Sequence, residues 1–304
     1  MTSDTIGSTE TFPLDDYLSI RRERVEKKLD ELLPDNSKGH PALIEAMRYA
    51  LMGGGKRFRP ILTLASCEAA GGDWEDALEP ACAVEFVHAY SLVHDDLPAM
   101  DDAIMRRGRE ACHRKYGEAL GILAGDGLLT EAWGVVSRWS AQKTDRCGAA
   151  VEIIRLLAQG AGLEGMVSGQ AYDMDENGPA DIKALDKLHG LKTGALIGAS
   201  ISIGAVIAGA DGRTMEKLSR YADAVGLAFQ VVDDILDVEG EETGKDSGAD
   251  AASGKRSYPV LAGMEGARRK AESLVEKAIV ALEGLPGPAE PMAAIARYAI
   301  ERKK

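Results

Sequence analysis

The chain has 304 residues, a formal net charge of −13 at pH 7, 45% apolar residues and only 5% aromatic residues. The acidic balance argues against nucleic acid as a partner and against attraction to an anionic membrane, because both need a basic surface. Frequent Ala, Leu, Gly and Glu, with little alternation of β-branched residues, predict an all-α protein. With no linker and no repeat array, we expect one domain over residues 1–304.

Residues 1–12 are expected to be disordered. We expect no signal peptide, because the N-terminus lacks a basic start followed by an apolar block. The uncharged run Thr193–Ala210 is long enough to span a bilayer, but its Gly, Ala and Ser content favours a buried helix. We therefore expect no stable membrane insertion. The cysteines have neither C-x-x-C nor zinc spacing, which is typical of free thiols in a reducing cytoplasm; they are Cys67, Cys82, Cys112 and Cys147.

Glycine and proline punctuate the predicted helices. In chain order, helices are predicted over residues 14–33, 41–52, from Pro60 to about Ala70, 74–97, 115–139, 146–170, 181–192, 193–209, 213–239, 257–284 and 289–302. Residues 239–257 form a polar loop without apolar anchors, and a loop of that length is typical of an active-site lid.

The segment Ser91–Asp102 places four carboxylates within eight residues, directly after an apolar helix. Buried carboxylates without partners either shift their pKa or find a cation. So many hard oxygen ligands suggest Mg²⁺, which is usually shared with substrate phosphates. Because Pro98 breaks the helical register, the spacing does not decide whether Asp101 or Asp102 joins Asp95.

A second acidic segment places Gln230, Asp233, Asp234 and Asp237 at i, i+3, i+4 and i+7, on one stripe of a helix. A solvated helix face is the alternative interpretation. However, the aspartates are near the C-terminal end, where the helix dipole disfavours negative charge. No Lys or Arg occurs between positions 220 and 245 to pair with them. The pattern therefore favours a second metal-binding helix.

Basic residues gather in three further places. The turn Gly53–Gly55 precedes three cations before a helix and could hold a diphosphate, although the spacing is not that of a P-loop. Each basic element alone is more often a solvated charge, but together with the acidic segments they predict a site for two polyphosphates. The basic residues concerned are Lys56, Arg57, Arg59, Arg106, Arg107 and Lys192.

Two histidines have alternative interpretations. His88 is seven residues before Asp95 on the same helix face, and a lone helix histidine is more often structural than functional. The pair His94-Asp95 is typical of metal-dependent phosphohydrolases, but those sites need several more histidine ligands. Only four others are present, at positions 40, 88, 113 and 189.

Several motifs in this order resemble the trans-prenyltransferases, and most of all the bacterial short-chain farnesyl diphosphate synthases. They are Gly54-Gly-Lys-Arg-x-Arg-Pro60, His88 to Asp102, Arg106-Arg-Gly108, Lys192-Thr-Gly194, Phe229-Gln-x-x-Asp-Asp-Ile-Leu-Asp237, Gly254-Lys-x-x-Tyr-Pro259 and Glu301-Arg-Lys-Lys304. The resemblance covers nearly the whole chain. It implies an isoprenoid-synthase fold, a helical bundle around a deep central cavity, in a cytoplasmic homodimer.

The resemblance also implies the roles of individual residues. Three Mg²⁺ ions would be held by Asp95, Asp101 and Asp233, supported by Asp96 and Asp237. The allylic diphosphate would be held by Arg106, Lys192, Thr193, Gln230 and Lys245 or Lys255. Isopentenyl diphosphate would be held by Gly55, Lys56, Arg59, His88 and Arg107. The expected catalytic set is Asp95, Asp101, Asp233, Lys192 and Arg106.

The implied reaction is ionisation, condensation and elimination, which adds isopentenyl diphosphate to dimethylallyl and geranyl diphosphate. Tyr90 and Ser91 are one turn before Asp95, about 6–8 Å deeper along the helix, so a large aromatic there predicts a C15 product. A C10 or C20 product, a terpene cyclase and a non-catalytic synthase subunit are the alternatives. The chain departs from its relatives at Ala103, often Asp, and in a slightly shorter segment 239–248, which makes the role of Lys245 less secure than that of Lys192.

Overall fold

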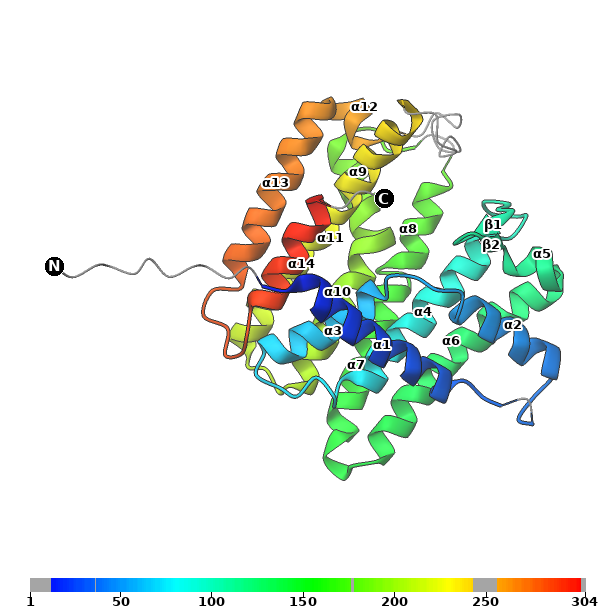
Figure 1. Ribbon diagram of the computed structural model, residues 1–304. Helices are drawn as coiled ribbons and strands as arrows, with labels where there is room; N and C mark the ends of the chain where they lie inside the picture. The colour runs from blue at the N-terminus through cyan, green and yellow to red at the C-terminus, as the bar shows by residue number, and fades with distance from the viewer. Residues whose placement is uncertain (1–11, 36, 176–177, 243–255, 302–304) are drawn as a thin grey trace.

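The computed structural model describes residues 12–35, 37–175, 178–242 and 256–301. Apart from one hairpin, the architecture is helical, as predicted (Figure 1). The helices are α1 (Leu14–Leu32), α2 (Pro41–Leu51), α3 (Phe58–Ala69), α4 (Leu78–Asp95), α5 (Cys112–Tyr116), α6 (Glu118–Ala141), η1 (Thr144–Arg146), α7 (Cys147–Ala161), α8 (Met166–Asp173), α9 (Ile182–His189), η2 (Gly190–Gly194), α10 (Ala195–Ile207), α11 (Gly212–Glu242), α12 (Tyr258–Ala262), α13 (Met264–Ala281) and α14 (Glu290–Glu301). The hairpin pairs β1 (Met105–Arg106) with β2 (Arg109–Glu110).

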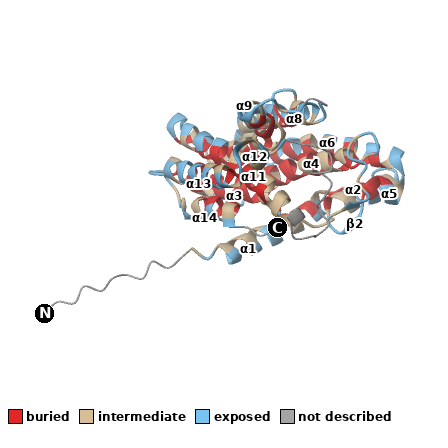
Figure 2. Ribbon diagram, turned by 90° about the horizontal axis from the view of Figure 1, so that it is seen from above, coloured by how far each residue is buried: buried red, intermediate tan, exposed pale blue. Residues whose placement is uncertain are grey.

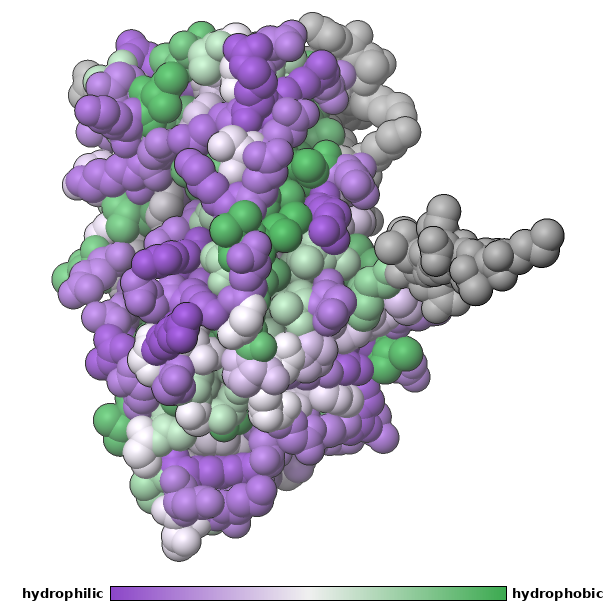
Figure 3. Space-filling view, turned by 90° about the vertical axis from the view of Figure 1, so that its left-hand side faces the viewer, coloured by the Kyte–Doolittle hydropathy of each residue, from purple (hydrophilic) through white to green (hydrophobic). Residues whose placement is uncertain are grey.

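The helices bury two apolar clusters on either side of α10. One cluster joins α4, α6 and α7 with parts of α1 and α2, and the other joins α3, α11, α13 and α14. Leu196 and Ile203 of α10 belong to the first cluster, and Ile197 and Ile201 belong to the second. Buried residues concentrate in the inner helices, and exposed ones on the outer faces of α1, α5 and α13 (Figure 2). The side of the molecule seen in Figure 3 is mostly hydrophilic.

Several predicted helix boundaries are wrong, and glycines explain most of them. The helix expected at 115–139 is divided at Gly117 (φ 87°), and the one expected at 257–284 is divided at Gly263 (φ 73°). The one expected at 146–170 is interrupted by a turn over 162–165. Residues 74–77 are a turn, capped by Asp73, whose side chain accepts from the Glu75 amide at 3.0 Å. Conversely, the segments 181–192 and 193–209 run together through the π-helical turn η2.

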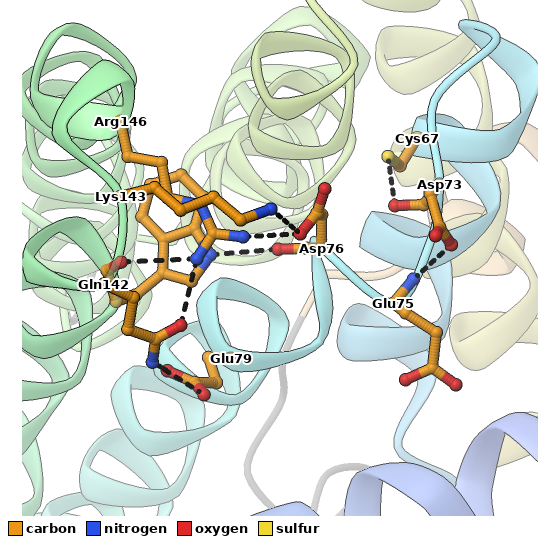
Figure 4. A network of polar contacts seen from close by, with 9 residues as sticks. Cys67, Asp73, Glu75, Asp76, Glu79, Gln142, Lys143 and Arg146 are labelled. Atoms are coloured by element: carbon orange, nitrogen blue, oxygen red, sulfur yellow. Dashed lines mark hydrogen bonds and ion pairs between the residues drawn. The ribbon is translucent and has the colours of Figure 1, made fainter.

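A polar network closes the end of the bundle where α6 turns into α7 (Figures 1 and 4). Asp76 accepts from Lys143 at 3.2 Å and also from Arg146, and its carbonyl accepts from the Trp139 indole at 3.0 Å. Gln142 donates to Glu79 at 3.0 and 3.1 Å. These contacts tie the start of α4 to the α6–α7 turn, and so fix one end of the helix whose other end carries the first acidic segment.

Two sequence predictions concern the ends and the membrane. The disorder expected for residues 1–12 concerns residues outside the described part, except Phe12, whose ring packs 5.5 Å from that of Tyr17. Two helical runs, Glu118–Ala141 and Ile182–Ile207, are long and apolar enough to cross a bilayer by composition and length alone. Core helices pass the same test, and α10 has eight buried residues, so the prediction of a buried helix there is confirmed.

Gly204 allows α10 to pack closely against α3. A β-carbon at this position would be 2.0 Å from the Ser66 hydroxyl and 2.1 Å from the Thr63 carbonyl oxygen. Ser66 itself donates to the Ile201 carbonyl at 2.8 Å, so it cannot move aside without breaking a buried hydrogen bond. Gly198, two turns away on the same helix, has no atom within 4 Å of its β-carbon position.

We therefore expect opposite effects from one substitution at two sites on α10. Gly204→Ala should destabilise the protein by about 1–3 kcal/mol, since overpacking outweighs the gain in helix propensity. Gly198→Ala should stabilise it by about 0.5–1 kcal/mol. Urea unfolding of both variants measures the difference, and equal effects at the two positions would contradict the close contact between α3 and α10.

Candidate active site

A cavity of ≈ 370 Å³ opens between α3, α4, α8 and the η2 turn. Its lining brings together residues far apart in sequence that the sequence predicted to act together. They are Arg59 from α3, His88, Tyr90, Ser91 and Asp95 from α4, and Lys192 and Thr193 from η2. Gln170, Met166 and Met174 line it as well. The polar and apolar residues share one space, as expected for a ligand with a charged head and a hydrocarbon tail.

The chain folds back immediately after α4. The amide of Asp101 donates to the Asp95 carbonyl at 2.9 Å, which brings Asp101 beside Asp95. Asp102 instead has a positive φ of 45° and accepts from Arg114 at 2.9 Å. The turn thus places the backbone of Asp101 next to Asp95 and pairs Asp102 with Arg114, while the choice of Asp101 as the metal ligand stays a prediction. Burial raises the pKa of Asp95 to about 6; nearby Lys192 opposes this increase and Asp101 adds to it.

Asp96 is directed away from the cavity and into the protein. Its side chain is 3% exposed, and its carboxylate accepts from Arg106 Nε at 2.9 and 3.2 Å. Arg106 lies on the short strand β1, and 39% of its side chain remains exposed. The expected roles of Asp96 near metal and of Arg106 on diphosphate stay predictions. This geometry shows that Asp96 orients Arg106.

The second acidic segment lies on the C-terminal half of α11. Gln230 donates to Asp233 at 3.1 Å. Burial lowers the pKa of Arg59, and the charges of Glu85 and then Asp233 oppose this shift. Asp234 has other partners, since its carboxylate accepts from the Tyr258 amide at 2.8 Å and contacts His189 Nε2 at 3.2 Å. Asp234 therefore ties α9 and α12 to α11, between the two expected ligand positions 233 and 237.

Lys192 approaches the cavity from the π-helical turn, an irregularity that is frequent at functional sites. Its ammonium group donates to Asp173 of α8 at 2.6 Å. Gly169 permits this approach, because a β-carbon there would be 2.2 Å from the Lys192 backbone nitrogen. The side-chain amide nitrogen and oxygen of neighbouring Gln170 are buried and have no hydrogen-bond partner. Because Gln170 lines the cavity, both atoms are available to a ligand there.

A basic subsite lies around His88, which lines the same cavity as Asp95. Arg59 Nη1 is 3.4 Å from His88 Nε2, and the Arg107 guanidinium donates to the Gly54 carbonyl oxygen. A β-carbon on Gly55 would be 2.7 Å from the Arg107 guanidinium, and the φ of 128° there favours glycine over any residue with a side chain. Burial, followed by the charges of Arg59 and Arg107, lowers the pKa of His88 well below its usual value. The exposed Lys56 lies outside this group, 5.9 Å from the Tyr298 ring.

Some expected site residues lie outside the described residues. These are Lys245 and Lys255, with most of the predicted lid. Within the described part of the chain, no three His, Cys, Asp or Glu side chains are arranged to hold one metal ion by themselves. Asp95 with Asp101 on one side and Asp233 with Asp237 on the other form two separate pairs.

The sequence did not predict several contacts that shape the site. Asp173, Gln170 and the contact of His189 with Asp234 were missed, and so was the burial of Arg57. Gln170 and Asp173 have i, i+3 spacing and so share a helix face, which is the one signal that could have indicated them.

The comparisons with known proteins agree with this geometry. Residues 40–283 match the family model described as polyprenyl synthetase. The chain belongs to the polyprenyl synthetase family. It is 45% identical over 270 residues to the farnesyl diphosphate synthase of Escherichia coli, covering 86% of this chain and 90% of that one. It is 42% identical to the geranylgeranyl diphosphate synthase of Cyanophora paradoxa, over 96% of this chain and 97% of that one.

The fold is shared as well. The apo crystal structure of an FPP/GFPP synthase from Zymomonas mobilis superposes with a TM-score of 0.83 at 35% identity, covering 94% of this chain and 98% of that one. The prediction of an all-α isoprenoid-synthase fold is confirmed, and so is that of a prenyltransferase.

The low pKa of His88 predicts a specific dependence of stability on pH. The unfolded chain takes up a proton near pH 6.5 and the folded chain does not, so the wild type loses stability as the pH falls below 6.5. His88→Gln removes this loss. Relative to that of the wild type, the free energy of unfolding of the variant should increase by up to about 1.4 kcal/mol for each pH unit below 6.5.

Urea unfolding at pH 7.5 and 5.5 measures this difference. His40→Gln, at the exposed N-terminal cap of α2, controls for the loss of an imidazole as such. If wild type and His88→Gln respond equally to pH, His88 takes up its proton normally and is not held neutral by its cationic neighbours.

Proposed function

We propose that this prenyltransferase is a Mg²⁺-dependent farnesyl diphosphate synthase, which condenses isopentenyl diphosphate with dimethylallyl and then geranyl diphosphate. The observation that supports this most is the division of one cavity into two charged ends. Asp95 and Lys192 line it as one charged group, with Asp101 next to Asp95, while Arg59 and His88 line it as a second, basic group. A terpene cyclase would need no second diphosphate subsite.

The acidic residues fit Mg²⁺ shared with a substrate. This ion usually takes one or two carboxylates and completes its coordination with water and phosphate oxygens. Two separate pairs of aspartates match that requirement, and in the part of the chain that the structure describes no group of three such ligands is found. Burial raises the pKa of Asp95, and a cation bound beside the carboxylate would oppose that shift. We assign Asp95, Asp101 and Asp233 to metal binding, supported by Asp237; the number of ions, expected to be three, rests on the family resemblance.

When bound, Mg²⁺ would neutralise charge on the departing diphosphate. Lys192 and Arg106 can donate to the same oxygens, and they are held in place by Asp173 and Asp96. Arg59, His88 and Arg107 orient isopentenyl diphosphate, with Gly55 leaving room for the Arg107 guanidinium. The apolar wall, including Met166 and Met174, excludes water from the allylic carbon chain. The proton released at elimination goes to the leaving diphosphate, so no side-chain base is required.

Tyr90 is proposed as the residue that ends chain growth. It lines the cavity, is 7% exposed and packs edge-on against His94, with ring centroids 5.8 Å apart. His94 is fixed in turn, 3.0 Å from the Ile122 carbonyl oxygen and against Gly125, where a β-carbon would be 2.1 Å from its Nε2. A ring supported this way cannot turn aside for a longer product. This supports a C15 product over a C20 product. Relatives of this chain include both farnesyl and geranylgeranyl diphosphate synthases.

The test is a product assay. Purified protein receives isopentenyl diphosphate with dimethylallyl or geranyl diphosphate, with and without Mg²⁺, and the products are sized by mass spectrometry. The wild type should give C15 from both primers only with Mg²⁺. Tyr90→Ala should shift the main product to C20 or longer, because it removes the ring that closes the cavity.

Tyr90→Phe is the matched control and should keep C15, since it retains the ring. An unchanged C15 product from Tyr90→Ala would contradict the role of Tyr90, while no condensation by the wild type would favour a non-catalytic subunit.

We further propose a homodimer, which the apolar face of α6–α8 supports. Leu123 of α6, Ile154 of α7 and Val167 of α8 are 40–49% exposed. On an otherwise charged chain, such a face suits a second copy. Analytical ultracentrifugation should give the mass of two chains, and a monomer would contradict this. A cytoplasmic location is likewise a proposal; it agrees with four free cysteines, three of them buried.

A further inference from the structure

Arg57 is directed away from the ligand cavity, although it lies between two residues of the proposed isopentenyl diphosphate subsite. Its side chain is 1% exposed and donates to Glu85 at 2.8 Å and to the Leu51 carbonyl at 3.0 Å. Its backbone has a positive φ of 51° at the start of α3, which disfavours any residue with a side chain. Such strain persists only where the surrounding contacts impose it.

The pair connects two elements that carry the subsite. Arg57 immediately precedes α3, which bears Arg59 one residue into the helix, and the Arg57 carbonyl accepts from the Ile61 amide at 3.1 Å. Glu85 lies on α4, three residues before His88 and therefore on the same face. The ion pair joins α3 to α4 one turn from the point where Arg59 approaches His88.

Glu85 is also a counter-charge for Arg57, Arg59 and Arg107. Burial lowers the pKa of both Arg59 and Arg107, and the charge of Glu85 opposes this at both residues, as that of Asp233 does at Arg59. The neighbouring arginines lower the pKa values further: Arg107 acts on Arg59, and Arg57 and Arg106 act on Arg107. Without Glu85, the guanidinium groups of Arg57, Arg59 and Arg107 would lose a carboxylate whose charge acts on all three before a diphosphate arrives. A buried ion pair contributes little to the free energy of unfolding, because burying the charges offsets their attraction. Stability therefore does not explain why this pair lies beside the subsite.

We propose that Arg57 and Glu85 form a positioning pair for the isopentenyl diphosphate subsite. Arg57 fixes the loop 53–57 in the one conformation that aims Arg59 at the diphosphate, and Glu85 keeps the neighbouring guanidinium groups together while the subsite is empty. Neither touches the substrate. The inference rests on the proposed function, because that assigns isopentenyl diphosphate to Arg59, His88 and Arg107.

The test replaces the pair by apolar residues of similar size, Arg57→Met with Glu85→Leu, so that no charge stays buried alone. Calorimetry measures the dissociation constant of isopentenyl diphosphate, and kinetics measure KM for both substrates. We expect the dissociation constant and KM of isopentenyl diphosphate to rise at least about tenfold, while KM of geranyl diphosphate changes less than about twofold. Arg57→Lys should restore part of the binding, because it keeps the charge.

The matched control is Arg21→Met, which removes another partly buried ion pair, Arg21 with Glu68, far from the cavity. It should change stability and leave both KM values as they are. If the double variant is folded and binds isopentenyl diphosphate like the wild type, or loses both substrates equally, the pair is merely structural and the inference is wrong. A wild type that does not bind isopentenyl diphosphate would overturn the proposed function instead.

Discussion

The site depends on the unfavourable confinement of carboxylates at the end of α4. Helix α4 is apolar along most of its length and ends in Asp95, whose pKa is raised mainly by burial. The chain then turns back so that Asp101 comes to the same place. Folding brings like charges together here instead of dispersing them, which costs stability unless cations compensate. Lys192 and Arg106 supply part of that compensation, and a divalent cation with diphosphate would supply the rest.

The compensating cations are themselves held by other acidic residues. Lys192 pairs with Asp173, Arg106 with Asp96, and Arg57 with Glu85. Asp173 and Glu85 are on helices α8 and α4, and Asp96 directly follows α4, so the cations keep their positions before any ligand binds. Such preorganisation is what electrostatic catalysis requires, since the protein need not rearrange as charge develops.

Much of this arrangement could be predicted from the sequence. The two acidic segments, Lys192 and the 53–59 turn have short spacings and fixed residue types, and the cavity unites Asp95, Lys192, Arg59 and His88 as the motifs suggested. Helix interiors were predicted better than their ends, because glycines such as Gly117 and Gly263 adopt positive φ where the hydrophobic pattern continues.

The contacts that the sequence could not predict join residues far apart along the chain. Arg57 and Glu85 are 28 positions apart and His189 and Asp234 are 45 apart, so no periodicity connects them. The sequence grouped Arg57 with Lys56 and Arg59 as ligand-binding cations. Only the fold shows that its side chain is directed inward, because the backbone turns at the start of α3.

The most direct test of the two-ended cavity is calorimetric binding of each substrate with and without Mg²⁺. An unreactive thio-analogue of geranyl diphosphate should bind about 100-fold more tightly when Mg²⁺ is added, since the acidic end repels it otherwise. The affinity for isopentenyl diphosphate, which is held by arginines, should change by less than about threefold when Mg²⁺ is added. Equal dependence on Mg²⁺ for both ligands would show that the cavity is not divided in this way.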